Sequence, residues 1–237
     1  EQVPAFFRDN YPNAKLHAAA VESEMTRGVE KGKIRPVSVR PRVVNPMNIV
    51  IKLVRDAKGN VKEKLRLVVD STRAGVNPRT ADRPCVFPSI TTALRCLRQG
   101  YYIAILDLTD AYFHLPLNLD FVGYVGVCSK LQYFLYEYLP FGLKSAPHAW
   151  STVVEAIRAF VQRQLDIHCP ELQAIFVYLD DWLIATKNEA DGHVALHWVR
   201  NAFRLLGILV SEAKTIDPTQ CGKYLGFIID TLNLWIS

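Results

Sequence analysis

Two adjacent aspartates, Asp180 and Asp181, lie in the middle of an apolar stretch, AIFVYLDDWLIAT at residues 174–186. The β-rich runs on either side predict two strands that meet at this pair. A buried carboxylate without a partner is very costly, so each must be paired, hydrogen-bonded, metal-bound or open to water. An ordinary turn is the simpler alternative, because Asp tolerates turn geometry well. The stretch predicts a hairpin with both carboxylates at its tip.

A third aspartate, Asp107, ends another apolar run, YYIAILDL at residues 101–108. A strand that ends beside such a hairpin can bring three carboxylates to one spot. Hard divalent cations, magnesium above all, prefer such an all-oxygen arrangement. Two ions about 3.5 to 4 Å apart form the usual clamp for in-line phosphoryl transfer. The three aspartates together therefore favour a metal site over three unrelated turns.

The rest of the pattern predicts a mixed α+β fold, because helices and strands alternate without βαβ regularity. Apolar residues at three-and-four spacing, together with cap and stop residues, predict the helices. The expected helices span Asn13 to about 28–32, Ser89 to Gly100, Ser145 to His168, and Asp191 to Leu206 with Gly207 after it. A hairpin is expected at 48–70 around the turn DAKGN, after a basic connector at 31–42.

Composition sets broad limits on the class of protein. A chain of 237 residues with 50% hydrophobic residues can bury a substantial core. Lys and Arg outnumber Asp and Glu by 28 to 23, a mild indication of a polyanionic partner. No apolar run approaches the roughly 20 residues that span a bilayer, and no signal peptide opens the chain. We expect no membrane contact.

Cysteine and histidine spacing argues against a zinc site. The five cysteines are widely separated and include no CxxC pair, which predicts reduced thiols in an intracellular protein of the nucleus or cytoplasm. His193 and His197 are four residues apart on a predicted helix, but no Glu follows His193 and no third ligand is evident. We interpret them as ordinary helix histidines.

Three stretches, LDLTDAYFHLPL, LPFGLKSAP and YLDDWLIA, occur in this order and resemble the successive palm motifs of retroelement reverse transcriptases. The resemblance covers nearly the whole chain. It is strongest to DIRS-type tyrosine-recombinase retrotransposons, with LTR-retrotransposon and pararetrovirus enzymes close. It implies a right-hand polymerase fold with fingers at about 1–84 and 116–145 and palm at about 85–115 and 146–237.

The resemblance also implies a reaction, RNA-directed DNA polymerisation. It implies two bound magnesium ions that assist this reaction and that manganese ions can replace. Asp107 and Asp180 would hold both ions, Asp181 would complete the site, and the carbonyl of Leu108 would be a further ligand. Lys214 in LGILVSEAKT matches a lysine that can protonate the departing pyrophosphate, although a solvated lysine is an equally good interpretation. The implied partners are an RNA or DNA template with its primer, and dNTPs.

The implied nucleotide site includes an aromatic wall and a basic grip. Tyr112 matches the ring beneath the incoming sugar that excludes a 2′-hydroxyl; the alternative is a core tyrosine. Arg66 matches the arginine that grips the triphosphate, with Lys52 or Arg55 as companion, unless these charges are simply solvated. The remaining implied residues are Asp110, Ala111, Phe141 and Gly142 at the nucleotide, Tyr224, Leu225 and Gly226 at the primer, and Arg35, Arg40, Arg42 and Arg73 at the duplex.

The chain begins at Glu1 and stops directly after the primer-grip-like hairpin, so we expect a piece of a longer polypeptide with no thumb. A protein partner or an oligomer could supply the thumb function. Two hypotheses remain. In one, the chain is a polymerase core; in the other, a polymerase-like domain is retained as a nucleic-acid-binding or protein-assembly module with weak or no activity.

Overall fold

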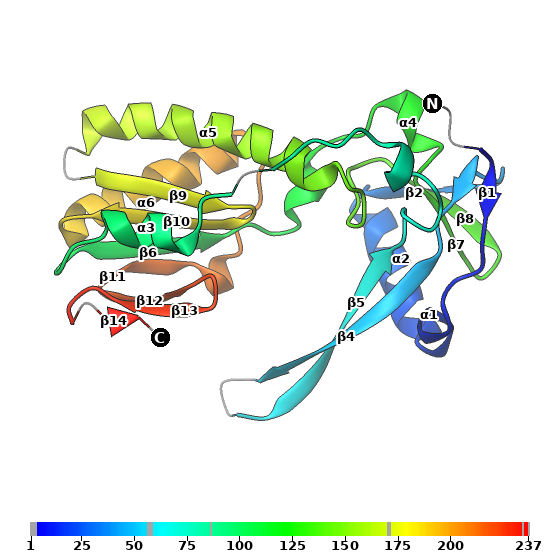
Figure 1. The fold of residues 1–237 in the computed structure, drawn as a ribbon, viewed down its shortest axis with the longest axis horizontal. Coiled ribbons are helices and arrows are strands. Elements are labelled where there is room, and N and C mark those ends of the chain that lie inside the picture. Colours follow the sequence, from blue (N-terminus) through cyan, green and yellow to red (C-terminus); the bar gives the residue numbers. More distant parts are fainter. Residues whose placement is uncertain (1–3, 56–58, 86, 170–171, 234, 237) are drawn as a thin grey trace. The chain divides into compact units, whose positions relative to one another are not determined.

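The computed structural model describes residues 4–55, 59–85, 87–169, 172–233 and 235–236 (Figure 1). The chain divides into two compact units, and each is built from two separated stretches of sequence. Unit 1 comprises Glu1–Arg83 and Tyr112–Ala146, and unit 2 comprises Pro84–Ala111 and Pro147–Ser237. The names fingers and palm for these units stay a prediction.

Unit 1 contains a five-stranded sheet in the order β1-β3-β7-β8-β2. Its strands are β1 Phe6–Phe7, β2 Ile34–Val37, β3 Val43–Val44, β7 Gly126–Ser129 and β8 Gln132–Tyr136. The basic connector expected at 31–42 therefore contains a strand, because β2 pairs with β8 from Ile34↔Tyr136 to Val37↔Tyr133. The partner strand lies about a hundred residues along the chain, where local sequence gives no sign of the pairing.

The first predicted helix is two helices, α1 Pro12–Leu16 and α2 Ala18–Glu30, which are separated at His17. Asn13 is not the cap, since Tyr11 holds that position and the Asn13 side chain instead donates to the carbonyl of Ile49. This bond joins α1 to β4. The cap prediction was wrong because the helix already begins at Pro12, so Asn13 lies inside its first turn.

The predicted hairpin is confirmed as β4 Met47–Arg55 and β5 Val61–Val69, which pair in continuous register from Met47↔Val69 to Arg55↔Val61 (Figure 1). Residues 56–58 of the expected turn lie outside the described residues. Burial changes along the hairpin: Met47, Ile49 and Val69 are buried, whereas Leu53 and Val61 are exposed. Only the base of the hairpin thus contributes to the core of unit 1.

Unit 2 contains a four-stranded antiparallel sheet in the order β11-β6-β10-β9. Its strands are β6 Tyr102–Asp107, β9 Leu172–Tyr178, β10 Asp181–Thr186 and β11 Ile216–Thr219. Consecutive residues of β6 and β10 are buried, so both faces of the sheet are covered there, as the continuous apolar runs predict. On one face Ile103 and Leu183 pack with α3 (Ile90–Cys96), and on the other Trp182 meets Phe203 of α6 (Glu189–Leu205) edge to face.

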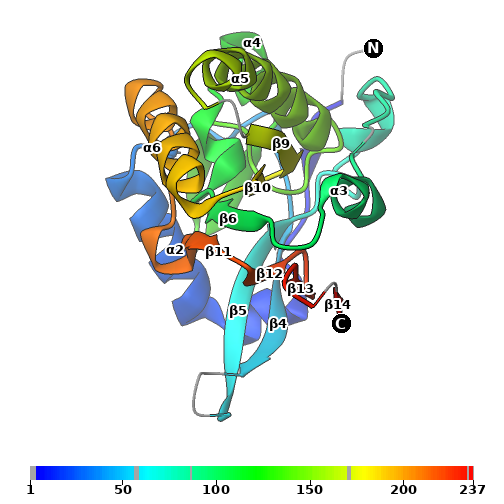
Figure 2. The ribbon, with the colours of Figure 1, turned by 90° about the vertical axis from the view of Figure 1, so that its left-hand side faces the viewer.

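The helices predicted in unit 2 are confirmed, except that α3 ends at Cys96 and not at Gly100, because the backbone is already extended at Leu97. Ser89 caps α3 by accepting the amide of Thr92, and α5 spans Ala146–His168. Helix α6 starts at Glu189, earlier than expected, because Asn188 accepts the amide of Asp191, and Gly207 after it has a φ of +70°. Figure 2 shows α5 and α6 along the same sheet, away from the small C-terminal sheet.

Shorter elements complete both units. The small C-terminal sheet comprises β12 Cys221–Tyr224, β13 Phe227–Asp230 and β14 Trp235–Ile236, and the remaining helical turns are α4 Leu119–Val122, η1 Asn77–Arg79, η2 Ala111–His114 and η3 Glu212–Lys214. In the described part of the chain, no helix has the length and apolarity that crossing a membrane requires. All five cysteines are described, and none is in a disulfide.

Candidate active site

The strand register brings the expected carboxylates together in unit 2. Asp107 ends β6 and is paired directly with Asp181, the first residue of β10. Asp180 lies in the turn before β10, and its carbonyl accepts the amide of Leu108 at 2.9 Å. Directly paired residues of antiparallel strands point to the same face, so Asp107 and Asp181 share one. The hairpin with aspartates at its tip is therefore confirmed.

A buried tryptophan supports the turn that carries Asp180. Leu179, the residue before it, has a φ of +55°, which an L-residue adopts only when its surroundings hold it there. The indole nitrogen of Trp150, on α5, donates to the Leu179 carbonyl at 3.0 Å, and Trp150 is fully buried. Trp150 lies within the helix expected at Ser145 to His168, but the sequence gave no signal for this bond to the turn.

The proximity of the three carboxylates has an electrostatic consequence. The pKa of Asp181 is raised to about 6, first by burial and then by the negative charges of Asp180 and Asp107, while Lys214 acts in the opposite direction. A carboxyl group with such a pKa is held in a place that disfavours its own charge. A cation at this position would relieve that penalty.

Lys214 is the expected site residue with the most direct contact to a carboxylate. Its Nζ lies 2.7 Å from Oδ1 of Asp107 and donates a hydrogen bond to it. The Lys214 side chain is 62% exposed, whereas that of Asp107 is only 15% exposed. The lysine is therefore neither a purely solvated side chain nor a buried one.

The donor set has the chemistry that a hard divalent cation prefers. Among the described residues, no three His, Cys, Asp or Glu side chains are arranged as a ready metal site. The three carboxylates lie at one end of two paired strands and supply only oxygen, which suits magnesium or manganese. One oxygen of Asp107 already accepts a hydrogen bond from Nζ of Lys214.

The raised pKa of Asp181 predicts how pH changes stability in EDTA. Its folded-state pKa of about 6 lies above the ordinary value of 3.8, so the folded state binds more protons between these pH values. Stability should therefore fall as pH rises from about 4 to about 6 and stay lower above that. Because the side chain is only partly buried, we discount the cost to about 1 to 2 kcal/mol.

Asp181→Asn should remove this penalty, so thermal unfolding at pH 7 in EDTA should occur about 2 to 8 °C higher than in the unchanged protein. The difference should shrink at pH 4. Asp217→Asn, at an exposed position of β11, is the matched control and should not change the pH profile. An Asp181→Asn variant less stable than the unchanged protein at pH 7 would contradict the electrostatic account.

The expected triphosphate residues lie on the β4–β5 hairpin of unit 1, but not all on one face. Arg66 pairs with Val50 and Lys52 pairs with Lys64, so these side chains share a face that also carries Lys62. Arg55 pairs with Val61 and falls on the opposite face. Lys52 is therefore the companion of Arg66 that the strand pleat favours.

Tyr112 and Phe141, also in unit 1, pack against each other with ring centroids 4.9 Å apart. Gly142 follows with a φ of +103°, and a Cβ built there would overlap the carbonyl oxygen of Val69. Its own carbonyl accepts a hydrogen bond from Asn77 at 2.8 Å. The absence of a side chain at Gly142 is thus already required by contacts inside the protein, whatever nucleotide approaches it.

The other expected nucleotide residues continue the chain after Asp107. Asp110 has a φ of +56°, and Ala111, which is buried, opens η2. Left-handed backbone is uncommon at non-glycine residues and occurs often at functional turns. The conformation alone does not show that a turn is functional. The role of both residues stays a prediction.

The four arginines expected at the duplex all have partners within unit 1. Arg35 forms an ion pair with Glu137 at 2.8 Å. The guanidinium groups of the other three lie over aromatic rings: Arg40 over Phe7, Arg42 over Tyr124 and Arg73 over Tyr11. Stacking orients a guanidinium without neutralising it, whereas the carboxylate of Glu137 offsets the charge of Arg35.

The primer-grip-like hairpin has the predicted turn. Leu225 and Gly226, between β12 and β13, have φ values of +49° and +92°. Tyr224 is buried, its hydroxyl lies 3.5 Å from the carbonyl oxygen of Asp181, and burial raises its pKa. The tyrosine thereby links this hairpin to the strand that carries the paired aspartates.

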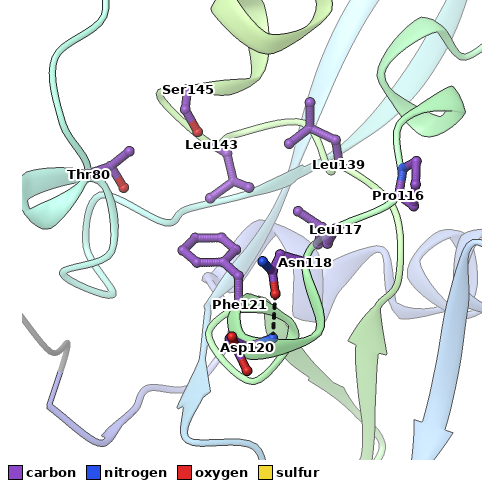
Figure 3. A pocket seen from close by; sticks show the side chains of 9 residues that line it. All are labelled: Thr80, Pro116, Leu117, Asn118, Asp120, Phe121, Leu139, Leu143 and Ser145. Carbon is purple, nitrogen blue, oxygen red and sulfur yellow. Dashed lines mark hydrogen bonds between the residues drawn. The ribbon is translucent and has the colours of Figure 1, made fainter.

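A pocket of about 430 Å³ lies in unit 1, with Phe121, Leu139 and Leu143 among its walls (Figure 3). Two of its polar groups already serve the fold. Asn118 caps α4 by accepting the amide of Asp120, and Thr80 donates to the Val76 carbonyl. None of the expected site residues lines this pocket.

Comparison with known proteins decides the family. The profile described as "Reverse transcriptase (RNA-dependent DNA polymerase)" matches residues 24–229, most of the chain and all three of the motif stretches. The chain belongs to the reverse transcriptase family. The resemblance drawn from the three motifs is confirmed at the level of the family, whereas the DIRS-type subclass stays a prediction.

Relatives of this reverse transcriptase domain come from viruses and retrotransposons. It is 26% identical to Protein P of duck hepatitis B virus (strain China) over 92% of its length, and 26% identical to the retrovirus-related Pol polyprotein from transposon gypsy of Drosophila melanogaster, again over 92%. The chain spans only 28% and 20% of those two proteins.

A solved structure supports the expected polymerase fold. The foamy viral protease-reverse transcriptase, determined in complex with double-stranded DNA, superimposes on 98% of the chain with a TM-score of 0.75 and 20% sequence identity. The chain covers 37% of that protein. The α+β polymerase fold is confirmed by this likeness.

Proposed function

We propose that this reverse transcriptase domain is the core of an RNA-directed DNA polymerase, which transfers nucleotides from dNTPs to a primer 3′-hydroxyl. One observation carries the proposal: Asp107 is paired with Asp181 at the end of two strands, with Asp180 bonded to Leu108 beside them. Membership of the family supports the same reaction class.

The carboxylates of Asp107, Asp180 and Asp181, with the carbonyl of Leu108, are the groups that would hold two magnesium ions. Such ions stabilise negative charge on the phosphates and make the primer hydroxyl a better nucleophile. The chain's own residues supply the remaining roles. Lys214 carries a proton that the departing pyrophosphate can accept, and Arg66 with Lys52 offers a cationic face for the triphosphate.

The test is primer extension by the purified protein with template, primer, dNTPs and Mg²⁺ or Mn²⁺. The double variant Asp180→Asn, Asp181→Asn is the inactive control. Extension that needs the ion and disappears in the double variant would support the proposal. Undiminished extension by the variant would show that another protein in the preparation is responsible.

A second candidate, a polymerase-like module that binds nucleic acid or protein, is favoured by one observation. Asp107 is already paired with Lys214, a cation of the chain's own. A protein that binds template and primer but extends nothing, with either ion, would select this candidate.

Tyr112→Ala should let ribonucleotides compete, because we propose the ring as a steric wall and not as a reactant. The ratio of kcat/KM for dNTP over rNTP should fall at least about tenfold. Tyr112→Phe keeps the ring and its packing on Phe141, so it should preserve the ratio. An unchanged ratio in a folded Tyr112→Ala variant would mean that Tyr112 only packs against Phe141 and does not select the sugar.

Binding of a primer-template duplex should weaken steeply with salt, because phosphate contacts release counterions. Each contact contributes roughly 0.9 to the slope of log K against log salt on B-form DNA. Arg40→Ala with Arg42→Ala should reduce that slope by about 1 to 2, since the two changes remove two cationic groups that we propose contact phosphates.

Two comparisons sharpen the salt experiment. Arg35→Ala should reduce the slope less, because Glu137 already offsets its charge. Lys15→Ala, at an exposed position of α1 where Lys15 pairs with Asp9, is the control and should leave the slope unchanged. A salt-independent affinity would exclude binding through phosphates.

A further inference from the structure

The carboxylate site contains a cation of the chain's own. Nζ of Lys214 lies 2.7 Å from Oδ1 of Asp107, whose side chain is only 15% exposed. Water therefore solvates the Asp107 carboxylate poorly, and the ammonium group of Lys214 is its charged partner. The lysine side chain is 62% exposed, so it can return to water at little cost.

The backbone builds this ion pair. The amide of Ser211 donates to the carbonyl of Asp107 at 2.8 Å, and the amide of Lys214 donates to the carbonyl of Ser211 at 3.0 Å. Glu212, the first residue of η3, is held by Arg200 at 2.6 Å. The backbone of Lys214 therefore belongs to a short turn that is hydrogen-bonded to the backbone of Asp107, which keeps the lysine side chain within reach of the Asp107 carboxylate.

The ammonium group also offsets repulsion among the three aspartates. Among the described residues, Asp180 and Asp107 place negative charge near Asp181, and Lys214 places a positive charge there. A divalent ion on Asp107 would take over this neutralisation. Two cations on one carboxylate would repel each other strongly at such short separations, so the ion and the ammonium group compete.

We propose that Lys214 is an internal counter-cation of the carboxylate site, which occupies Asp107 without metal and leaves it when a divalent ion binds. The inference rests on the proposed function and adds to it the order in which the two cations occupy Asp107. The ammonium group and the divalent ion occupy Asp107 in turn, because both need the same carboxylate.

The first test measures Mn²⁺ affinity without nucleic acid or nucleotide, by the loss of the free ion's electron paramagnetic resonance signal. Lys214→Met removes the competing charge, so Mn²⁺ should bind about three- to tenfold more tightly. Lys214→Arg keeps a competing charge and should bind nearly as the unchanged protein does. Lys187→Met removes a lysine just beyond the far end of β10, roughly 20 Å along the strand, and should change nothing.

The second test is a double-mutant cycle on thermal unfolding in EDTA. Lys214→Met should lower the unfolding temperature in the unchanged background, because the aspartates lose their counter-cation. Its effect should be clearly smaller in the Asp107→Asn background, where the ion pair is already gone and only the weaker attraction between Lys214 and Asp181 remains. This cycle involves no catalytic activity and isolates the contact between Lys214 and Asp107.

The outcomes separate this inference from the proposed function. Mn²⁺ binding that is unchanged or weaker in Lys214→Met overturns the inference, as does equal tightening in Lys187→Met. Absence of Mn²⁺ binding in every protein overturns it together with the metal assignment. If Mn²⁺ binds more tightly to Lys214→Met as expected, but the unchanged protein extends no primer, the polymerase function is contradicted and the inference about Lys214 still holds.

Discussion

Asp107→Asn should reduce primer extension on the order of 10³-fold or more, because an amide oxygen cannot replace the charge that holds a divalent ion against developing phosphate charge. The effect should appear in the rate of the first added nucleotide, measured in single turnover with Mg²⁺. We expect the fold to survive, since the Asp107 backbone still pairs with Asp181 and accepts the amide of Ser211.

The stability of the same variant is a separate measurement. Losing one of three repelling carboxylates stabilises the metal-free protein, but Asp107 also loses its ion pair with Lys214. The two effects oppose each other, so its unfolding temperature in EDTA should change by only a few degrees. Asp181→Asn loses no such pair and should be the more stabilised. A variant that is unfolded in EDTA would make its lost activity uninformative about metal binding.

Gly142→Ala should destabilise the folded protein by at least about 3 kcal/mol, a large loss for a single methyl group. Two costs combine. The backbone at Gly142 has a φ of +103°, and the new Cβ would overlap the carbonyl oxygen of Val69, which a strand holds in place. The measurement is chemical denaturation of the purified protein, or its soluble yield if the variant does not fold.

Gly32→Ala is the matched control in the same unit. Its φ is +65°, and no atom lies within 4 Å of the position that a Cβ would take. It should therefore cost only about 1 to 2 kcal/mol, the strain of left-handed backbone alone. Equal losses at the two glycines would mean that the Val69 contact can relax and that only conformation matters.

Local patterns in the sequence were sufficient to locate the aspartates. The apolar runs on both sides of Asp180 and the strand that ends at Asp107 predicted elements that the structure contains. Ser89, Gly207 and the spacing of α5 predicted helix positions for the same reason, since caps and periodicity act within a few residues. Such features depend on neighbours in sequence.

Other features depend on partners far along the chain, and these escaped prediction. The bond from Asn13 to the carbonyl of Ile49 ties α1 to β4, and a second helix begins after His17. Strand β2 exists because β8 pairs with it. The indole nitrogen of Trp150, on α5, donates to the carbonyl of Leu179 in the β9–β10 turn. Arg55 lies on the opposite face of its hairpin from Arg66 because of the strand register.

The interleaving of the two units has a consequence for how the chain acquires its structure during synthesis. Unit 1 needs β7 and β8, yet the ribosome delivers residues 84–111 of unit 2 before them. Strand β2 must therefore wait for β8 while part of the other unit, including β6 with Asp107, has already emerged. Domains usually fold as units in the order of their synthesis. Here unit 1 is complete only after residues 84–111 of unit 2 have emerged, and unit 2 is complete only at the end of the chain, so no single cut would separate them into two fragments that each hold a whole unit.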